Sequence, residues 1–163
     1  MIIKLKNKDT LIIDNFKLKC CIGRKGISKK KSEGDLCTPQ GKYKIGYLYW
    51  RPDKVEKPIT KLKCKKIKKN MGWCNDVRSH LYNREFKIRN NIRHEKLYRK
   101  DYKYDYFINI KYNDKKIVKG KGSALFLHLT KKYNPTAGCI ALKKKDFLIL
   151  AKLLEKENTI NIY

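Results

Sequence analysis

Short runs in which apolar and polar residues alternate occupy most of the first two-thirds of the chain. A period of two is typical of strands that bury one face, and the runs are separated by Gly, Asn, Asp and Pro, which favour turns. The pattern predicts strands at residues 2–6, 11–14, 17–22, 42–49, 104–112 and 123–129, and a closing strand at 159–163. The first two flank a turn at residues 7–9 and are expected to form a hairpin.

A different period marks residues 143–155. Phe147, Leu150, Ala151 and Leu154 recur at intervals of three and four, which places them on one face of a helix that we expect to pack on the sheet. Residues 50–99, with two prolines and many charges, predict loops and short helices. The pattern as a whole predicts a β-rich α+β fold with one main helix near the C-terminus.

The length and composition of the chain fit one folded domain. Its 163 residues can enclose a core without disulfides or metals, so we expect a single domain over residues 1–163. With 41% hydrophobic residues it is too apolar for a disordered basic tail. No run approaches the roughly 18 apolar residues of a membrane span. Lys4, Lys6 and Lys8 interrupt the N-terminal run, so no signal peptide is visible there.

The formal net charge is +27, from 42 Lys and Arg against 15 Asp and Glu. A surface with this much positive charge attracts polyanions, and nucleic acid is the first candidate for a binding partner. Most of the charge is Lys, however, spread along the whole chain, while Arg, which contacts phosphates and bases with two hydrogen bonds, is sparse. An AT-rich genome also enriches Lys codons without selection for function. The charge alone therefore indicates no nucleic-acid partner, and we expect none.

Cysteines and glycines exclude two further classes of site. The six cysteines form no CxxC pair and no spacing typical of zinc, so we expect no metal site. Most of them are expected to be small buried residues, with one disulfide such as Cys64–Cys74 left open. Gly120-Lys121-Gly122-Ser123 looks like the end of a phosphate-binding loop, but Lys115 and Leu125 stand where nucleotide motifs need glycine.

Two later segments hold the strongest candidate chemistry. An apolar run ends at His128, and Gly138-Cys139 opens the next apolar run after a polar loop. Adjacent strands would bring the two side chains together as base and nucleophile, and an imidazolium beside Cys139 would lower the pKa of the thiol from about 8.5 to below 7. Gly138 would let the amides of residues 138 and 139 face a developing oxyanion. From spacing alone, a core cysteine and a hydrogen-bonded histidine are the simpler alternative.

The order of these residues resembles the L,D-transpeptidase catalytic domain, the YkuD-like family of cysteine enzymes that remodel bacterial peptidoglycan. The family signature, a His followed at a distance by Ser/Thr-x-Gly-Cys, is matched by His128 and Thr136-Ala137-Gly138-Cys139. Further matching blocks follow one another over most of the chain: Gly23-Arg24-Lys25-Gly26, Glu33-Gly34-Asp35, Thr38-Pro39, Gly41, Trp73-Cys74-Asn75-Asp76, Tyr82-Asn83-Arg84, His94-Glu95, Tyr104-Asp105 and Tyr112-Asn113.

The resemblance implies a curved β-sheet or sandwich with one main C-terminal helix, and acyl transfer between peptidoglycan stem peptides. Cys139 would attack a donor carbonyl, His128 would move protons, and an amine of a second stem would resolve the thioester, without cofactor or metal. Water as the acceptor would make the enzyme an L,D-carboxypeptidase. The implied location is the periplasm or the cell envelope.

Substrate contacts are assigned to polar residues of the matching blocks and of the two catalytic segments. The set is Tyr82, Asn83, Arg84, His94, Ser123 and Thr136. Arg84 is the best candidate, because a guanidinium can bind a substrate carboxylate with two hydrogen bonds. We expect Arg84 and His94 to face Cys139 across a groove.

Three features depart from the common family pattern. Ala137 replaces the His that often precedes Gly-Cys, Ala141 and Leu142 stand where many members carry Asn or Arg, and the loop from His128 to Cys139 is short. Similar features mark a compact branch in which some members form 1,3 links, from L-Ala to diaminopimelate, instead of the usual 3,3 links. The linkage stays open, as do two other functions: a nucleic-acid-binding module and an inactive wall-binding domain.

Overall fold

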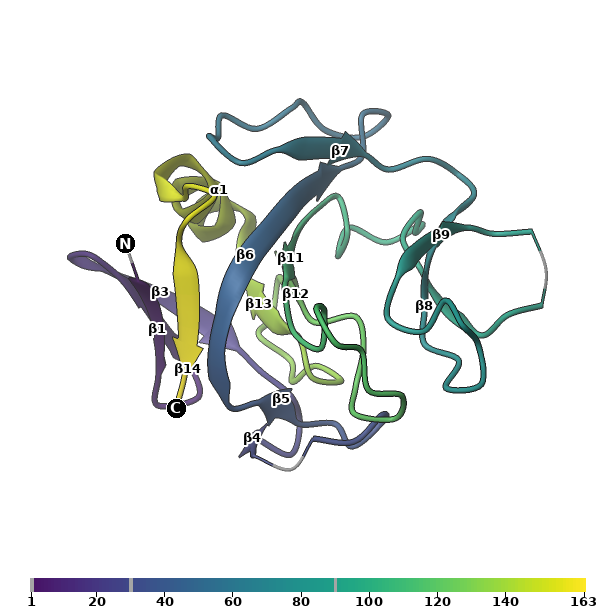
Figure 1. Cartoon of the computed structure of the whole chain (residues 1–163). Coiled ribbons are helices and arrows are strands. Elements are labelled where there is room, and N and C mark those ends of the chain that lie inside the picture. The colour runs from purple at the N-terminus through teal and green to yellow at the C-terminus, as the bar shows by residue number, and fades with distance from the viewer. Residues whose placement is uncertain (1, 30, 90) are drawn as a thin grey trace.

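The computed structural model describes residues 2–29, 31–89 and 91–163 of the chain (Figure 1). The seven predicted strands are present as β1 (Ile2–Lys6), β2 (Thr10–Ile13), β3 (Phe16–Cys21), β6 (Gly41–Trp50), β11 (Tyr106–Ile110), β12 (Phe126–Leu129) and β14 (Thr159–Ile162). The predicted helix is α1 (Lys144–Leu153). Three short strands, β4 (Ile27–Ser28), β5 (Thr38–Pro39) and β13 (Ile140–Leu142), complete this part of the fold. The β-rich α+β class is confirmed.

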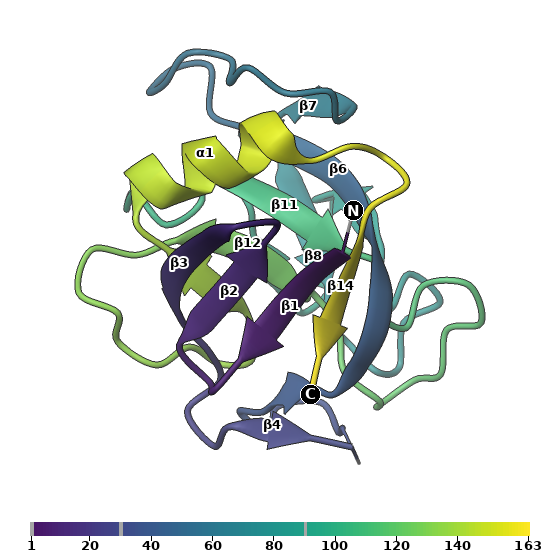
Figure 2. The ribbon, with the colours of Figure 1, turned by 90° about the vertical axis from the view of Figure 1, so that its left-hand side faces the viewer.

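Strand pairing closes eight of these strands into a ring. The order is β11-β12-β13-β3-β2-β1-β14-β6, and β11 also pairs with β6, so that the last strand meets the first. The pairs β1–β14 and β12–β13 are parallel, and the others in the ring are antiparallel. Figure 2 shows β1, β2, β3 and β14 curving side by side around the interior. The curved sheet implied by the family resemblance is thus closed on itself.

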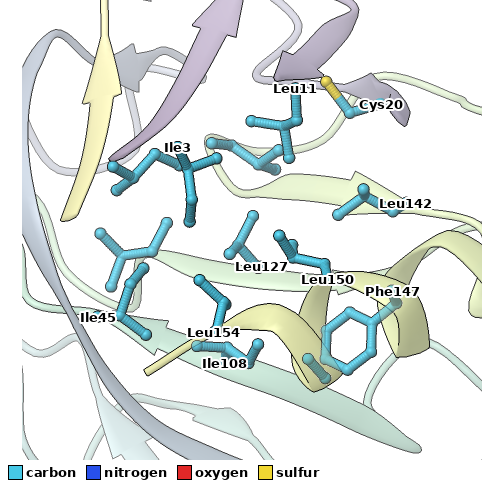
Figure 3. Packing of buried hydrophobic residues seen from close by; sticks show 14 of the residues in the cluster. Ile3, Leu11, Cys20, Ile45, Ile108, Leu127, Leu142, Phe147, Leu150 and Leu154 are labelled. Carbon is cyan, nitrogen blue, oxygen red and sulfur yellow. The ribbon is translucent and has the colours of Figure 1, made fainter. Parts of the chain in front are cut away.

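The interior of the ring is a core of aliphatic and aromatic side chains. Alternate residues of each strand enter it, as in β1, where Ile3 and Leu5 are buried between exposed neighbours. Helix α1 adds Phe147 and Leu150 to the same core, and Figure 3 shows both beside Leu142. Each such buried side chain contributes about 1.5–3 kcal/mol. This burial holds the helix in place although its N-cap residue makes no side-chain capping bond.

The outer face of β6, β11 and β12 carries a second, aromatic cluster. Because neighbouring residues of a strand point to opposite faces, Tyr49, Phe107 and Phe126 face away from the interior of the ring. The rings of Tyr49 and Phe107 stack with centroids 4.4 Å apart, and Phe126 lies 4.6 Å from Phe107. The edge of Trp73 packs on Phe126 at 5.1 Å, which joins a separate three-stranded sheet to the ring.

This second sheet corrects the prediction for residues 50–99. The described residues of that region form β7 (Cys64–Lys66), which pairs with β6, and the sheet β10-β8-β9, made of β8 (Met71–Cys74), β9 (Glu85–Lys87) and β10 (His94–Lys96). In Figure 1 β8 and β9 stand beside the ring, connected to it by long coils. Strands of three or four residues are too short to show an alternating pattern, so the sequence predicted loops and short helices here.

Candidate active site

The parallel pair β12–β13 places the two predicted catalytic side chains on one face of the sheet. His128 pairs with Ala141, and Cys139 lies two residues before Ala141, so both side chains project on the side of Phe126. They line a common cavity of about 410 Å³ between the ring and the three-stranded sheet. The structure thus brings together the imidazole and thiol that the sequence singled out.

The thiol of Cys139 is held between two backbone groups of the neighbouring segment. It donates a hydrogen bond to the carbonyl oxygen of Ala124 at 3.2 Å, and the N–H of Phe126 donates to Sγ at 3.4 Å. Burial is the main cause that raises the pKa of the thiol from 9.0 to about 12; the Phe126 N–H opposes the rise, the Glu95 carboxylate adds to it, and Lys31 opposes it. The expected thiolate with a pKa below 7 is therefore wrong for the resting site.

His128 is held in a neutral form suited to act as a base. Its Nδ1 lies 3.0 Å from the carbonyl oxygen of Leu129, which can only accept, so Nδ1 carries the proton and Nε2 is left with a lone pair. Burial is the main cause that lowers the pKa of the imidazole from 6.5 to about 4; the bond to the Leu129 carbonyl opposes the drop, and the charges of Lys103 and Arg99 add to it. The ring of Tyr104 packs edge-on against the imidazole at 5.5 Å. At neutral pH both members of the pair are uncharged.

Gly138 is needed for the turn that presents Cys139. Its φ of +143° disfavours any side chain, and a Cβ would lie 2.8 Å from the carbonyl oxygen of Cys37. Its own carbonyl accepts from the Thr38 hydroxyl at 2.8 Å, and its N–H donates to Thr136 Oγ1 at 3.1 Å. The Gly138 amide is thus engaged, which corrects its expected role as an oxyanion donor. The N–H of Cys139 has no hydrogen-bond partner in the described part of the chain.

Thr136 and Asn83 support this geometry instead of pointing at a substrate. Thr136 lines the cavity, but its hydroxyl donates to the carbonyl of Cys139 at 2.5 Å. Asn83 is buried, and its Oδ1 accepts from Trp73 Nε1 at 2.9 Å and from the N–H of Ala124 at 3.0 Å. Its Nδ2 donates to two backbone carbonyls. Ala124 has a φ of +51°, so this amide fixes the strained residue whose carbonyl holds the thiol.

The structure separates three other predicted substrate residues from the nucleophile. Arg84 is exposed and does not line the cavity, so the expected groove between Arg84 and Cys139 is absent from the described residues. His94 packs on Phe86 with ring centroids 5.6 Å apart, because it points to the opposite face of β10 from Glu95, which does line the cavity. Tyr82 is buried in the core and does not line the cavity.

Charged residues that the sequence did not single out surround the nucleophile. Besides Ser123, which was predicted, the cavity is lined by five cations and two carboxylates: Arg24, Lys31, Arg93, Arg99, Lys103, Glu33 and Glu95. The blocks Gly23-Arg24, Glu33-Gly34-Asp35 and His94-Glu95 of the family resemblance carried a signal for three of them, Arg24, Glu33 and Glu95. Arg93, Arg99 and Lys103 had none, because a chain with 42 basic residues offers many equivalent candidates.

Metal ligation and disulfide bonding are not supported by the placement of the ligating residues. In residues 2–29, 31–89 and 91–163 no three His, Cys, Asp or Glu side chains converge on a possible metal position. All six cysteines are free, so the pairing of Cys64 with Cys74 does not form, and Cys20, Cys21 and Cys74 are buried as expected. No helix of the described chain has the length and apolar character required to cross a membrane.

Comparisons with known proteins agree with this architecture. A family model for the L,D-transpeptidase catalytic domain (YkuD) matches residues 2–162. Two crystal structures of the helical cell shape determining protein Pgp2 from Campylobacter jejuni, one of them a point mutant, share the fold with TM-scores of 0.52 and 0.50 at 18% identity. The alignments cover 99% of this chain but only 46% of Pgp2. No curated protein sequence matches.

Proposed function

The chain belongs to the L,D-transpeptidase catalytic domain family, and from this membership we propose that it transfers an acyl group of a peptidoglycan stem peptide through a thioester on Cys139. The observation that carries the proposal is the shared cavity of Cys139 and His128, with the thiol protonated and Nε2 of the imidazole unprotonated. A nucleophile and a base on one face of two paired strands are the minimum that acyl transfer requires.

The first half-reaction forms the thioester. As the donor carbonyl approaches, the thiol proton leaves its bond to Ala124 and passes to Nε2 of His128, while Sγ forms a bond to the carbonyl carbon. The N–H of Cys139, which has no partner in the described structure, stabilises the oxyanion. The C–N bond of the donor then breaks, and the departing amine takes the proton from the imidazolium.

The second half-reaction releases the acyl group. An amine of a second stem peptide gives its proton to His128 and attacks the thioester carbon. The C–S bond breaks and the imidazolium returns the proton to Sγ, which restores the thiol and releases a cross-link of the 3,3 or the 1,3 type. Water in place of the amine yields a shortened stem, the L,D-carboxypeptidase outcome. Side chains and backbone groups account for every step, so the proposal includes no cofactor. Such a substrate places the reaction in the periplasm or cell envelope, and through the wall it would influence cell shape.

The test is incubation of the protein with purified muropeptides, followed by mass spectrometry of the products and of the intact protein. We expect cross-linked or shortened muropeptides and a mass increase on Cys139 equal to the donor acyl group. Cys139→Ala should fold normally and show neither. Cys64→Ala is the matched control, because Cys64 is half-buried outside the cavity. Products formed by the Cys139→Ala variant would refute the proposal.

A further inference from the structure

The outward-facing side chains of five neighbouring strands form a surface that the proposed chemistry does not use. In the order β3-β2-β1-β14-β6, strand register and alternation place one set of side chains outside the core. Figure 2 shows the outer side of four of these strands, β1, β2, β3 and β14. The set, which we call the lysine face, consists of six exposed lysines with three uncharged polar and three apolar residues: Lys4, Lys6, Lys17, Lys19, Lys42, Lys44, Thr10, Thr159, Asn161, Ile2, Ile12 and Tyr163.

The charges of the lysine face have no acidic partner. None of its lysines takes part in an ion pair within residues 2–29, 31–89 and 91–163. The five strands contain no Asp or Glu, although at the overall ratio of 42 basic to 15 acidic residues six lysines would be accompanied by about two carboxylates. The face is therefore a positive field of one sign, open to an external anion.

A hollow of about 720 Å³ lies at one end of the lysine face. In Figure 2 β1 and β14 end there, beside β4. Cationic and apolar side chains line the hollow together, among them Lys4, Lys6, Lys8, Lys25, Ile12 and Tyr163. Lys8 and Lys25, like the lysines of the face, form no ion pair with the described residues. Cations and apolar groups in one recess suit a ligand that carries a phosphate next to hydrocarbon.

We propose that the lysine face docks on the surface of an anionic phospholipid bilayer, with a headgroup phosphate in the hollow. Lysines are compact charges on flexible stems and need no fixed geometry, which suits a layer of mobile headgroups. The five strands contain no Arg, the residue that binds nucleic-acid phosphates and bases with two hydrogen bonds. Ile2 and Tyr163, 42% and 63% exposed, project on the same side and would enter the headgroup region. An anionic glycan offers no hydrocarbon to such side chains.

Docking in this way orients the catalytic pair. In the closed ring β1 lies four strands from β12 in either direction, so the outer sides of β1 and β12 face opposite ways. His128 projects from the outer side of β12, into the cavity that also holds Cys139. With the lysine face on lipid, that cavity opens away from the bilayer. The docking itself requires no step of acyl transfer.

Co-sedimentation with lipid vesicles tests the docking. One set of vesicles is an equal mixture of phosphatidylglycerol and phosphatidylcholine, and the other is phosphatidylcholine alone. We expect the wild-type protein to bind the anionic set at least tenfold more tightly. The combined variant Lys4→Gln, Lys6→Gln, Lys42→Gln should weaken this binding about a hundredfold, because each lysine near an anionic leaflet contributes about fivefold. Ile2→Ser with Tyr163→Ser should weaken binding to vesicles and leave binding to duplex DNA unchanged.

The matched control is Lys66→Gln, Lys69→Gln, Lys87→Gln, which makes the same change in net charge at exposed lysines outside the face and should bind vesicles as the wild type does. Wild-type protein that fails to bind anionic vesicles, or binds both sets equally, overturns the inference whether or not the variants fold. Equal losses in the two lysine variants would show that net charge alone acts, which also overturns it. Tighter binding to duplex DNA or to sacculi than to vesicles, lost only in the variant of the face, would assign the face to another polyanion.

Discussion

Alkylation of Cys139 by a small electrophile such as iodoacetamide reports the acid–base state of the resting site. Only the thiolate reacts. With a pKa of about 12, the thiolate fraction at pH 7 is about 10⁻⁵, against about 10⁻² for a thiol at the ordinary 9.0. We therefore expect Cys139 to be alkylated about a thousandfold more slowly than an unperturbed thiol at pH 7, with a rate that rises tenfold per pH unit up to pH 10.

The role of His128 separates this state from a preformed ion pair. Because the imidazole is neutral above about pH 4, it does not stabilise a thiolate in the resting protein. His128→Ala should thus leave the alkylation profile between pH 6 and pH 10 almost unchanged, while it abolishes thioester formation, which needs the base. The same pKa predicts that turnover persists as the pH falls through 6.5 and declines only near pH 4, where the imidazole becomes protonated.

The assay is pulsed alkylation across this pH range, followed by peptide mass spectrometry of all six cysteines. Cys20 is an internal reference, because burial also raises the pKa of its thiol to about 12. Cys139 labelled first of the six at pH 7, with a midpoint below pH 7 that His128→Ala removes, would show a thiolate–imidazolium pair and refute the neutral resting state.

Four further outcomes follow from the structure. Asn83→Ala should lower the free energy of unfolding, measured with denaturant, by about 2 kcal/mol or more, because the indole N–H of Trp73 and the backbone N–H of Ala124 lose their acceptor. An unchanged midpoint of denaturant unfolding would contradict this. Gly138→Ala should lower the melting temperature, since its Cβ would meet a carbonyl oxygen at 2.8 Å; a melting curve equal to that of the wild type would be inconsistent with the turn described. Arg84→Ala should leave KM for a muropeptide donor unchanged, whereas Arg93→Ala and Lys103→Ala should raise it; the opposite order would reinstate Arg84 as the substrate residue. Added salt should weaken binding to isolated sacculi more than turnover of a small soluble donor, because long-range attraction is screened; a parallel loss of both would place the surface charge within the active site.

The sequence by itself determined the features that depend on local periodicity and residue type. Alternation with period two predicted seven of the eight strands of the ring, because burying one face of a strand needs every second residue to be apolar; β13, buried along its whole length, showed no such pattern. Apolar residues at intervals of three and four predicted α1, because residues with that spacing lie on one face of a helix. The apolar run that ends at His128 and the Gly138-Cys139 turn indicated a base and a nucleophile on neighbouring strands, and the ordered family blocks identified the domain.

Only the tertiary structure decided which charges surround the nucleophile and in which protonation state it rests. Glu95 faces the cavity and the adjacent His94 packs on Phe86, because neighbouring residues of a strand point to opposite faces. A strand of three residues is too short for the sequence to show which face is which. Arg93 and Lys103 reach the site while Arg84 does not, since packing between segments distant in sequence selects among many similar basic residues. The raised pKa of the Cys139 thiol arises from burial among surrounding groups, and burial is a property of the assembled cavity that no local pattern of residues encodes.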